Sequence, residues 1–220
     1  TSISVFNSVV YYSLNYTQVL NGVLMISTIP VFIIFFSGLF KTESIRIYQI
    51  IGVVISLLGV ISIITKLDLS LLLSLKLNKG DLWMLVAMIS WTTYSLLLGK
   101  KKVKLEPFIF LQTIIIIGLL FLFPMYLAEV LVGKKINFNF PVLMTIGYVV
   151  FFAGIGAYTF WNAAIKLIGP SRSGVFLHLM PIFSSLMAVF LLGEQFSFHH
   201  IVGTLLIISG ILLSSKKQTI

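Results

Sequence analysis

The chain has 220 residues, of which 59% are hydrophobic and only 10% are charged, and its mean hydropathy is +1.11. This composition excludes an ordinary soluble globular domain, in which about a quarter of the residues are charged. The formal net charge of +9 does not indicate nucleic-acid binding, because the basic residues occupy short breaks between apolar runs and leave no soluble surface for a duplex.

The apolar runs are long enough to cross a bilayer, which takes about 20 residues of helix. A membrane barrel is excluded, because stretches such as residues 108–123 and 205–213 are apolar at nearly every position and lack the alternation of barrel strands. The sequence therefore predicts an all-α integral membrane protein. Its eight expected helices cover residues 2–16, 19–40, 47–65, 82–99, 107–132, 141–167, 172–192 and 197–215.

A displacement of 151 residues aligns the sequence with itself. Matched Pro, Glu and Gly residues carry this alignment, since matched aliphatic residues mean little in such a chain. Internal duplication of an apolar chain is typical of secondary transporters. The matched pairs are Pro30 with Pro181, Glu43 with Glu194, Gly52 with Gly203, Gly59 with Gly210, Lys66 with Lys217, Phe32 with Phe183 and Ile50 with Ile201.

We expect the first copy at residues 1–66, a linker at residues 67–79 with a short interfacial helix, and the second copy at residues 80–217. The first two helices of the second copy have no counterpart in the first. We therefore expect about 71 further residues with two helices before Thr1, and ten helices in all. Five helices per copy is an odd number, which predicts two repeats in opposite orientations.

The distribution of Lys and Arg predicts the orientation in the membrane, since cytoplasmic loops retain these residues. Ten lie on the side of the C-terminus and five on the other, so we expect a cytoplasmic C-terminus in the inner (plasma) membrane. The ten are Lys41, Arg46, Lys100, Lys101, Lys102, Lys104, Lys166, Arg172, Lys216 and Lys217, and the five are Lys66, Lys76, Lys79, Lys134 and Lys135.

The segment from Trp161 to Lys217 has Pro181 within one helix, Leu192-Gly193-Glu194 at its end, and two glycines seven residues apart in the next helix. The first copy keeps the matching Pro, Glu and glycines but has Lys41-Thr42 in place of Leu-Gly. In these marks the chain resembles EamA-type carriers of the drug/metabolite transporter superfamily. The resemblance implies inverted repeats around a central cavity that opens alternately to each side, and it leaves the substrate open.

Polar and aromatic side chains at helical spacing are the candidates for substrate binding. A face turned to lipid carries Leu, Ile and Phe, so we expect these stripes to point inward. Aromatic rings with polar edges suit amphipathic solutes, although helix contacts and interfacial aromatic belts explain them equally well. The candidates are Tyr11, Asn15, Asn21, Met25, Thr28, Trp91, Tyr94, Tyr158, Trp161 and Asn162.

His178 is expected well inside a span, where a titratable group predicts a substrate ligand or a proton carrier. A neutral imidazole that donates to a nearby carbonyl is the alternative. Pro30 and Pro181 each remove a backbone donor, which predicts either a hinge with a free carbonyl or a kink that serves packing. Small residues at helical spacing predict close helix packing, and these are Gly52, Gly59, Gly203 and Gly210.

All six acidic residues are expected in loops or at helix ends, so the sequence predicts no buried carboxylate for a coupling ion. It contains no HExxH, no GxSxG and no cysteine, so we expect neither an enzyme nor a cofactor or metal site. We expect a transporter that moves small metabolites or amino acids, in the export direction. A multidrug exporter and a sensor or assembly subunit stay open as alternatives, as does a homodimer.

Overall fold

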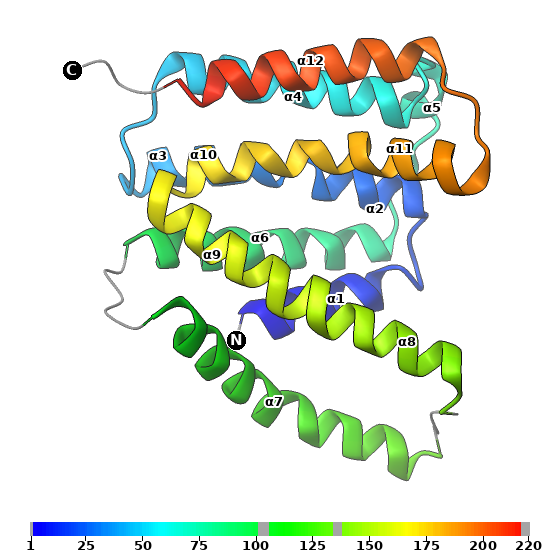
Figure 1. Ribbon diagram of the computed structural model, residues 1–220. Coiled ribbons are helices and arrows are strands. Elements are labelled where there is room, and N and C mark those ends of the chain that lie inside the picture. The colour runs from blue at the N-terminus through cyan, green and yellow to red at the C-terminus, as the bar shows by residue number, and fades with distance from the viewer. Residues whose placement is uncertain (1, 101–105, 134–137, 217–220) are drawn as a thin grey trace.

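The computed structural model describes residues 2–100, 106–133 and 138–216, and all regular secondary structure in these segments is helical (Figure 1). The prediction of an all-α membrane protein is confirmed. The α-helices are α1 Ser2–Ser13, α2 Val19–Ile26, α3 Ile29–Leu39, α4 Ile47–Ile64, α5 Leu69–Leu73, α6 Lys79–Lys100, α7 Pro107–Leu131, α8 Phe140–Tyr148, α9 Ala157–Ile168, α10 Pro170–Val175, α11 Met180–Leu192 and α12 Phe198–Ser214.

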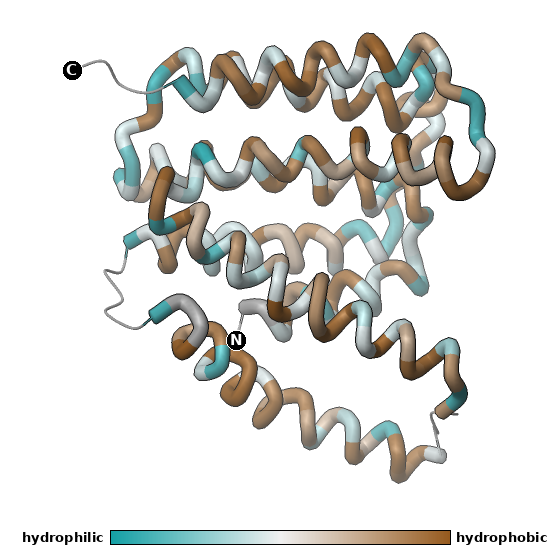
Figure 2. The backbone as a smooth tube through the Cα atoms, in the orientation of Figure 1, coloured by the Kyte–Doolittle hydropathy of each residue, from teal (hydrophilic) through white to brown (hydrophobic). Residues whose placement is uncertain are grey.

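The protein is a multi-pass membrane protein. Within the described segments, six helical stretches are long and apolar enough to cross a bilayer, while α12 has 17 residues and α1 has 12. Apolar residues run along the helices, and polar residues collect at the two ends of the bundle (Figure 2). The six stretches are Val19–Leu39, Ile47–Ile64, Lys79–Lys100, Ile109–Leu131, Phe140–Ile168 and Pro170–Leu192.

Two of the expected helices, residues 19–40 and 172–192, are each interrupted near the proline for which the sequence predicts a hinge or a kink. A break separates α2 from α3, and Pro30 lies in the first turn of α3. A 3-10 segment, Phe176–Leu179, separates α10 from α11, and Pro181 lies in the first turn of α11. Proline lacks an N–H and its ring clashes with the preceding turn, so in both cases it begins a new helix.

The expected helix over residues 141–167 also departs from regular geometry. A π-helical segment, Val149–Gly156, joins α8 to α9. None of the residues of α8 or of the π-helical segment is buried, so this part of the chain lies at the outside of the bundle with α7 (Figure 1). Such segments occur mostly as single insertions within α-helices, often at functional sites.

Helices α4 and α12 lie side by side and run in opposite directions (Figure 1). A Cβ on Gly52 would lie 2.5 Å from the Gly210 carbonyl oxygen, and one on Gly59 would lie 2.6 Å from the Gly203 carbonyl oxygen. Glycine therefore permits an approach that any other residue would prevent. The displacement of 151 residues exchanges the two contacts, as expected of two copies in opposite orientations.

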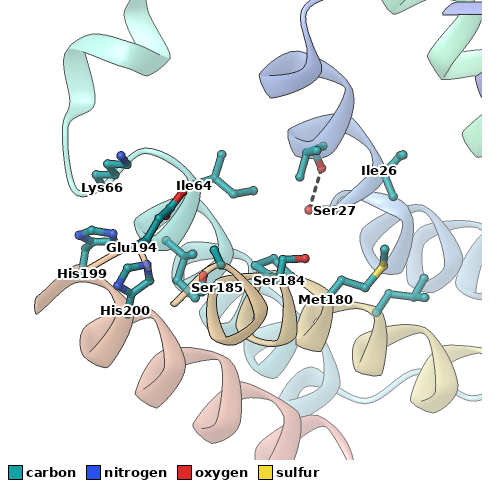
Figure 3. Close-up of a pocket in the computed structure, with 15 residues that line it drawn as sticks. Ile26, Ser27, Ile64, Lys66, Met180, Ser184, Ser185, Glu194, His199 and His200 are labelled. Atoms are coloured by element: carbon teal, nitrogen blue, oxygen red, sulfur yellow. Dashed lines mark hydrogen bonds between the residues drawn. The ribbon is translucent and has the colours of Figure 1, made fainter. Parts of the chain in front are cut away.

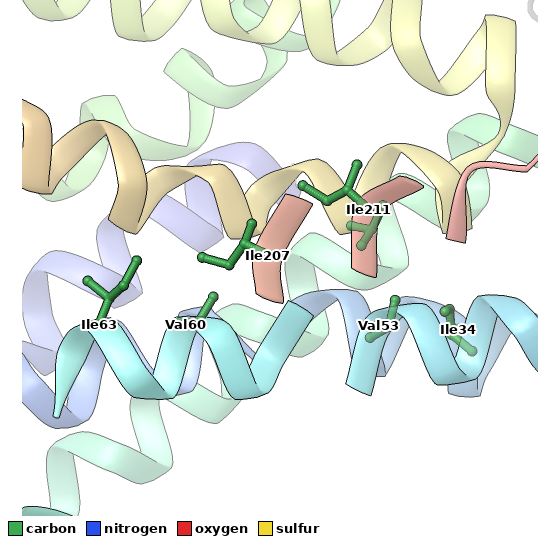
Figure 4. Close-up of a cluster of buried hydrophobic side chains, with 7 residues drawn as sticks. Ile34, Val53, Val60, Ile63, Ile207 and Ile211 are labelled. Atoms are coloured by element: carbon green, nitrogen blue, oxygen red, sulfur yellow. The ribbon is translucent and has the colours of Figure 1, made fainter. Parts of the chain in front are cut away.

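The buried apolar residues beside these glycines come mainly from α4 and α12, with contributions from α3 and α10 (Figure 4). Lipid tails are as apolar as these side chains, so close packing rather than exclusion from water holds the helices together. The cluster consists of Ile34, Val53, Val60, Ile63, Val175, Ile207 and Ile211.

Asp81, in the first turn of α6, is only 3% exposed, which corrects the prediction that no acidic residue is buried. Its carboxylate accepts hydrogen bonds from the Thr17 hydroxyl, the Asn21 amide and the Asn78 backbone N–H. The Asn78 side chain in turn accepts from the Asp81 N–H at 3.1 Å, which forms a reciprocal cap on α6. Burial is tolerated because neutral donors satisfy the carboxylate.

The end of α3 differs from the end of α11 in a way that predicts a stability change. Lys41 follows α3 with φ 50°, whereas Gly193 caps α11 with φ 70°. A left-handed conformation costs a residue with a Cβ about 1–2 kcal/mol. We expect Lys41→Gly to raise the free energy of unfolding by about 1 kcal/mol, measured by thermal unfolding in detergent.

The matched control is Ser44→Gly in the same loop, because Ser44 has no positive φ. This change adds freedom only to the unfolded chain and should lower stability slightly. Equal destabilisation by Lys41→Gly and Ser44→Gly would contradict the assignment of strain to Lys41.

Candidate functional site

Five of the predicted substrate-binding residues lie together between α6 and α9. The Trp91 ring is at their centre, with centroid distances of 5.9 Å to Tyr94, 5.6 Å to Tyr158 and 5.3 Å to Trp161. Tilted rings at these separations attract one another through their quadrupoles. Asn162 completes the group, and we call Trp91, Tyr94, Tyr158, Trp161 and Asn162 the aromatic cluster.

Hydrogen bonds hold the cluster together across helices. The Tyr94 hydroxyl donates to Asn162 Oδ1 at 2.5 Å, which joins α6 to α9. The Asn7 amide of α1 donates to the Tyr158 hydroxyl at 2.7 Å. Phe6, also on α1, lies 4.8 Å from the Trp91 ring between centroids. Neither Asn7 nor Phe6 is among the sequence candidates, although Asn7 shares a helical face with the candidates on α1.

Three N–H donors of the aromatic cluster are buried without a hydrogen-bond partner in the described part of the chain. They are Nε1 of Trp91, Nε1 of Trp161 and Nδ2 of Asn162. A buried donor left unsatisfied costs about 1–3 kcal/mol, so an arrangement with three of them needs an explanation. All three are donors and none of the five residues is charged. The cluster is therefore suited to hydrogen-bond acceptors on an otherwise flat or apolar solute.

Tyr11 and Asn15 lie away from the aromatic cluster. Tyr11 lies in α1 and Asn15 in the turn that follows it, and both line a cavity of about 940 Å³ whose opposite wall is formed by α7 residues such as Tyr126. Tyr11 is 66% exposed, and the Asn15 amide donates to the Tyr11 carbonyl at 3.2 Å, at the end of α1. The polar face of α1 therefore turns from the aromatic cluster at Asn7 to this cavity, which we call the outer groove, at Tyr11.

The three candidates of the second expected helix hold α2 in place. The Asn21 amide donates to the Lys76 carbonyl at 3.2 Å, in addition to its bond to Asp81. Met25 packs against the buried apolar residues around Trp91. The Thr28 hydroxyl donates to the Met25 carbonyl at 2.7 Å, directly at the break before α3.

His178 connects the two interrupted helices. Its Nε2 lies 2.8 Å from the Ser27 carbonyl oxygen and therefore donates to it, while Nδ1 lies 2.6 Å from the Ser56 hydroxyl of α4. The Ser27 carbonyl needs this donor, because Pro30 has no N–H and the Val31 N–H donates to a different carbonyl, that of Thr28. Of the two interpretations of His178 from the sequence, this geometry matches the neutral imidazole that donates to a nearby carbonyl.

A family model described as the EamA-like transporter family matches residues 1–65 and 78–216. The chain belongs to the EamA-like transporter family. The resemblance inferred from Pro181, Leu192-Gly193-Glu194 and their counterparts in the first copy is thereby confirmed.

Known proteins similar to this EamA-like chain are described as transporters without an assigned substrate. The uncharacterized transporter YyaM of Bacillus subtilis is 26% identical over 211 residues, which are 96% of this chain and 68% of YyaM. An uncharacterized transporter of Archaeoglobus fulgidus is 27% identical over 208 residues, 94% of this chain and 71% of that protein. A solved crystal structure superimposes with a TM-score of 0.72 at 16% identity, over 97% of this chain and 72% of its own, which shows the shared fold.

Two hydrogen bonds in this EamA-like chain join residues that the 151-residue displacement relates. They are Asn7 with Tyr158 and Ser27 with His178. Two repeats in opposite orientations are related by a half-turn about an axis in the membrane plane. Two residues that this half-turn exchanges can be in contact only if both lie next to the axis. Tyr158 of the aromatic cluster and His178 therefore each join the two expected copies by a hydrogen bond.

Proposed function

We propose that the protein carries small metabolites or amino acids across the inner (plasma) membrane, in the export direction, by alternating access to the aromatic cluster. Membership of the EamA-like family supports a carrier. The observation that carries the choice of site is that three buried N–H donors, without a partner among the described residues, lie among aromatic rings beside the Asn7–Tyr158 hydrogen bond.

The fold suggests how access to the cluster would change. In the described structure the aromatic cluster is closely packed, so a solute needs α6 and α9 to separate. The breaks between α2 and α3 and between α10 and α11 are the points where a helix bends at least cost, because the regular hydrogen bonds are already absent there. A bound solute would return partners to the three donors and take over the stacking on Trp91.

The same proposal places the C-terminus in the cytoplasm. The ends of α3, α6 and α9 lie with the C-terminus at one end of the bundle, and this end carries more of the described basic residues than the other (Figure 1). They are Lys41, Arg46, Lys100, Lys166, Arg172 and Lys216 at this end, and Lys66, Lys76 and Lys79 at the other. Lys101, Lys102, Lys104, Lys134, Lys135 and Lys217 of the sequence prediction lie outside the described residues.

Trp161→Phe tests the site, because it keeps an aromatic ring and removes one donor. We expect the KM for exchange of radiolabelled phenylalanine in proteoliposomes to rise about tenfold, with kcat little changed, since one hydrogen bond to the solute carboxylate is lost. Phenylalanine is the probe because its carboxylate accepts hydrogen bonds and its ring can stack.

The matched control is Trp83→Phe. Trp83 lies on α6, one of the two helices that carry the aromatic cluster, but it lies outside the cluster and is 44% exposed. Exchange should be unaffected by this change. An equal KM for the two variants would contradict the proposed site. Absence of exchange for phenylalanine and for a panel of other amino acids and metabolites would favour the sensor or assembly subunit.

A further inference from the structure

A second cavity, of about 370 Å³, lies among α2, α4, α11 and α12 (Figure 3). It shares no lining residue with the aromatic cluster, and none of its lining residues belongs to α6 or α9. Its volume is at the lower end of the range for pockets that hold small ligands. The residues that line it fall into a charged end and an apolar body.

The charged end is formed where α4 ends and α12 begins. Lys66 follows α4, Glu194 follows α11, and His199 and His200 belong to the first turn of α12, and Figure 3 shows the four side chains gathered there. His200 Nδ1 accepts a hydrogen bond from the Ser197 N–H at 3.0 Å, so its imidazole caps the helix. Lys66, Glu194 and His199 remain as groups that a ligand can use.

The body of the cavity is mostly apolar. Ile26 and Met180 lie farther from the charged end, with serine hydroxyls between (Figure 3). Val23, Leu177 and Ala188 add further apolar surface. A ligand that fits must therefore combine a compact polar head with an apolar tail.

We propose that this cavity binds a zwitterionic solute with an aliphatic side chain, of the amino-acid type. The carboxylate would lie at Lys66 and His199, the ammonium at Glu194, and the side chain against Ile26 and Met180. The presence of both charge signs at one end favours a zwitterion, because a simple anion would face Glu194 and a simple cation would face Lys66 without compensation. The proposal goes beyond the proposed function, since it concerns a different cavity and a binding event that needs no transport.

Carbethoxylation of His199 by diethylpyrocarbonate measures occupancy of this cavity directly. In the purified full-length protein, the modification rate of His199, distinguished from that of His200 by fragmentation of the peptide, is followed by mass spectrometry, with the fully buried His178 as internal reference. We expect saturating leucine to slow modification of His199 about tenfold. Isoamylamine and 4-methylpentanoate, which each lack one charge of leucine, should give little protection at the same concentration, because each loses one charge-assisted contact.

Glu194→Gln provides the second arm of the test, because it keeps the shape of the side chain and removes the partner of the ammonium. We expect half-maximal protection to need about tenfold more leucine. Glu106→Gln is the matched control, since Glu106 is exposed before α7 and remote from the cavity. Its protection curve should coincide with that of the unmodified protein.

Three results would overturn the proposal: no protection by leucine, equal protection by either singly charged analogue, or an unchanged curve for Glu194→Gln. Failure of the aromatic cluster as a transport site would be seen differently. It would leave leucine protection of His199 intact while Trp161→Phe has no effect on exchange.

Discussion

Gly52→Val should lower the free energy of unfolding by about 3 kcal/mol, the upper range for overpacking a close helix contact. The added Cβ would lie 2.5 Å from the Gly210 carbonyl oxygen and 2.6 Å from the backbone nitrogen of Ser214. Both neighbours are backbone atoms of α12, so no side chain can turn aside and the helices must separate. We expect the midpoint of thermal unfolding in detergent to fall by roughly 6–12 °C.

Gly147→Val is the control for this change. Gly147 lies in α8, and a Cβ there would meet no other atom within 4 Å. Valine and glycine differ little in helix propensity, so stability should stay within about 0.5 kcal/mol of the unmodified protein. Similar unfolding midpoints for Gly52→Val and Gly147→Val would show that α4 and α12 are not held by close backbone contact.

His178→Ala should lower the free energy of unfolding by about 3 kcal/mol through two effects. It leaves a cavity at a side chain that is fully buried, and it leaves the Ser27 carbonyl without a donor. The lost hydrogen bond to Ser27 is also the one that directly joins the two interrupted helices. We therefore expect a broader or earlier thermal transition in detergent and a lower maximal rate of phenylalanine exchange.

His178→Gln and His178→Asn separate the two hydrogen bonds. The Gln amide can reach the position of Nε2 and donate to Ser27, whereas the shorter Asn amide reaches only the position of Nδ1 near Ser56. We expect the Gln variant to recover more stability than the Asn variant. Equal stability of the Ala and Gln variants would argue against the bond to Ser27. Loss of proton-driven exchange in a stable Gln variant would instead assign His178 the role of proton carrier.

The helices and the family could be predicted from the sequence because they depend on local patterns. Long apolar runs fix the spans, and Pro181 with Leu192-Gly193-Glu194 marks the family. The position of the break before Pro30 could not be predicted. The sequence shows where the proline is, but not which backbone carbonyls lose their hydrogen-bond donors. Here the missing donor comes from His178, which lies 151 residues away from Ser27.

The candidate site was predicted in part. The face that holds Tyr94 and the face that holds Asn162 could be identified from helical spacing, but their hydrogen bond joins residues 68 positions apart. Tyr11 belongs to an equally polar stripe, but it lies in the outer groove. Helical spacing identifies which residues share a face of a helix, but not which neighbouring helix that face contacts. Asp81 was expected at an exposed helix end, and its burial depends on Thr17 from another segment.

The glycine contacts between α4 and α12 also bear on which parts can move. Gly52 and Gly59 are seven residues apart, so the two contacts are separated by about 10 Å along α4. Two separated points of backbone contact prevent both sliding and rotation of one helix against the other. The pair therefore acts as a stationary frame, and any change of access must come from bending of the interrupted helices beside it.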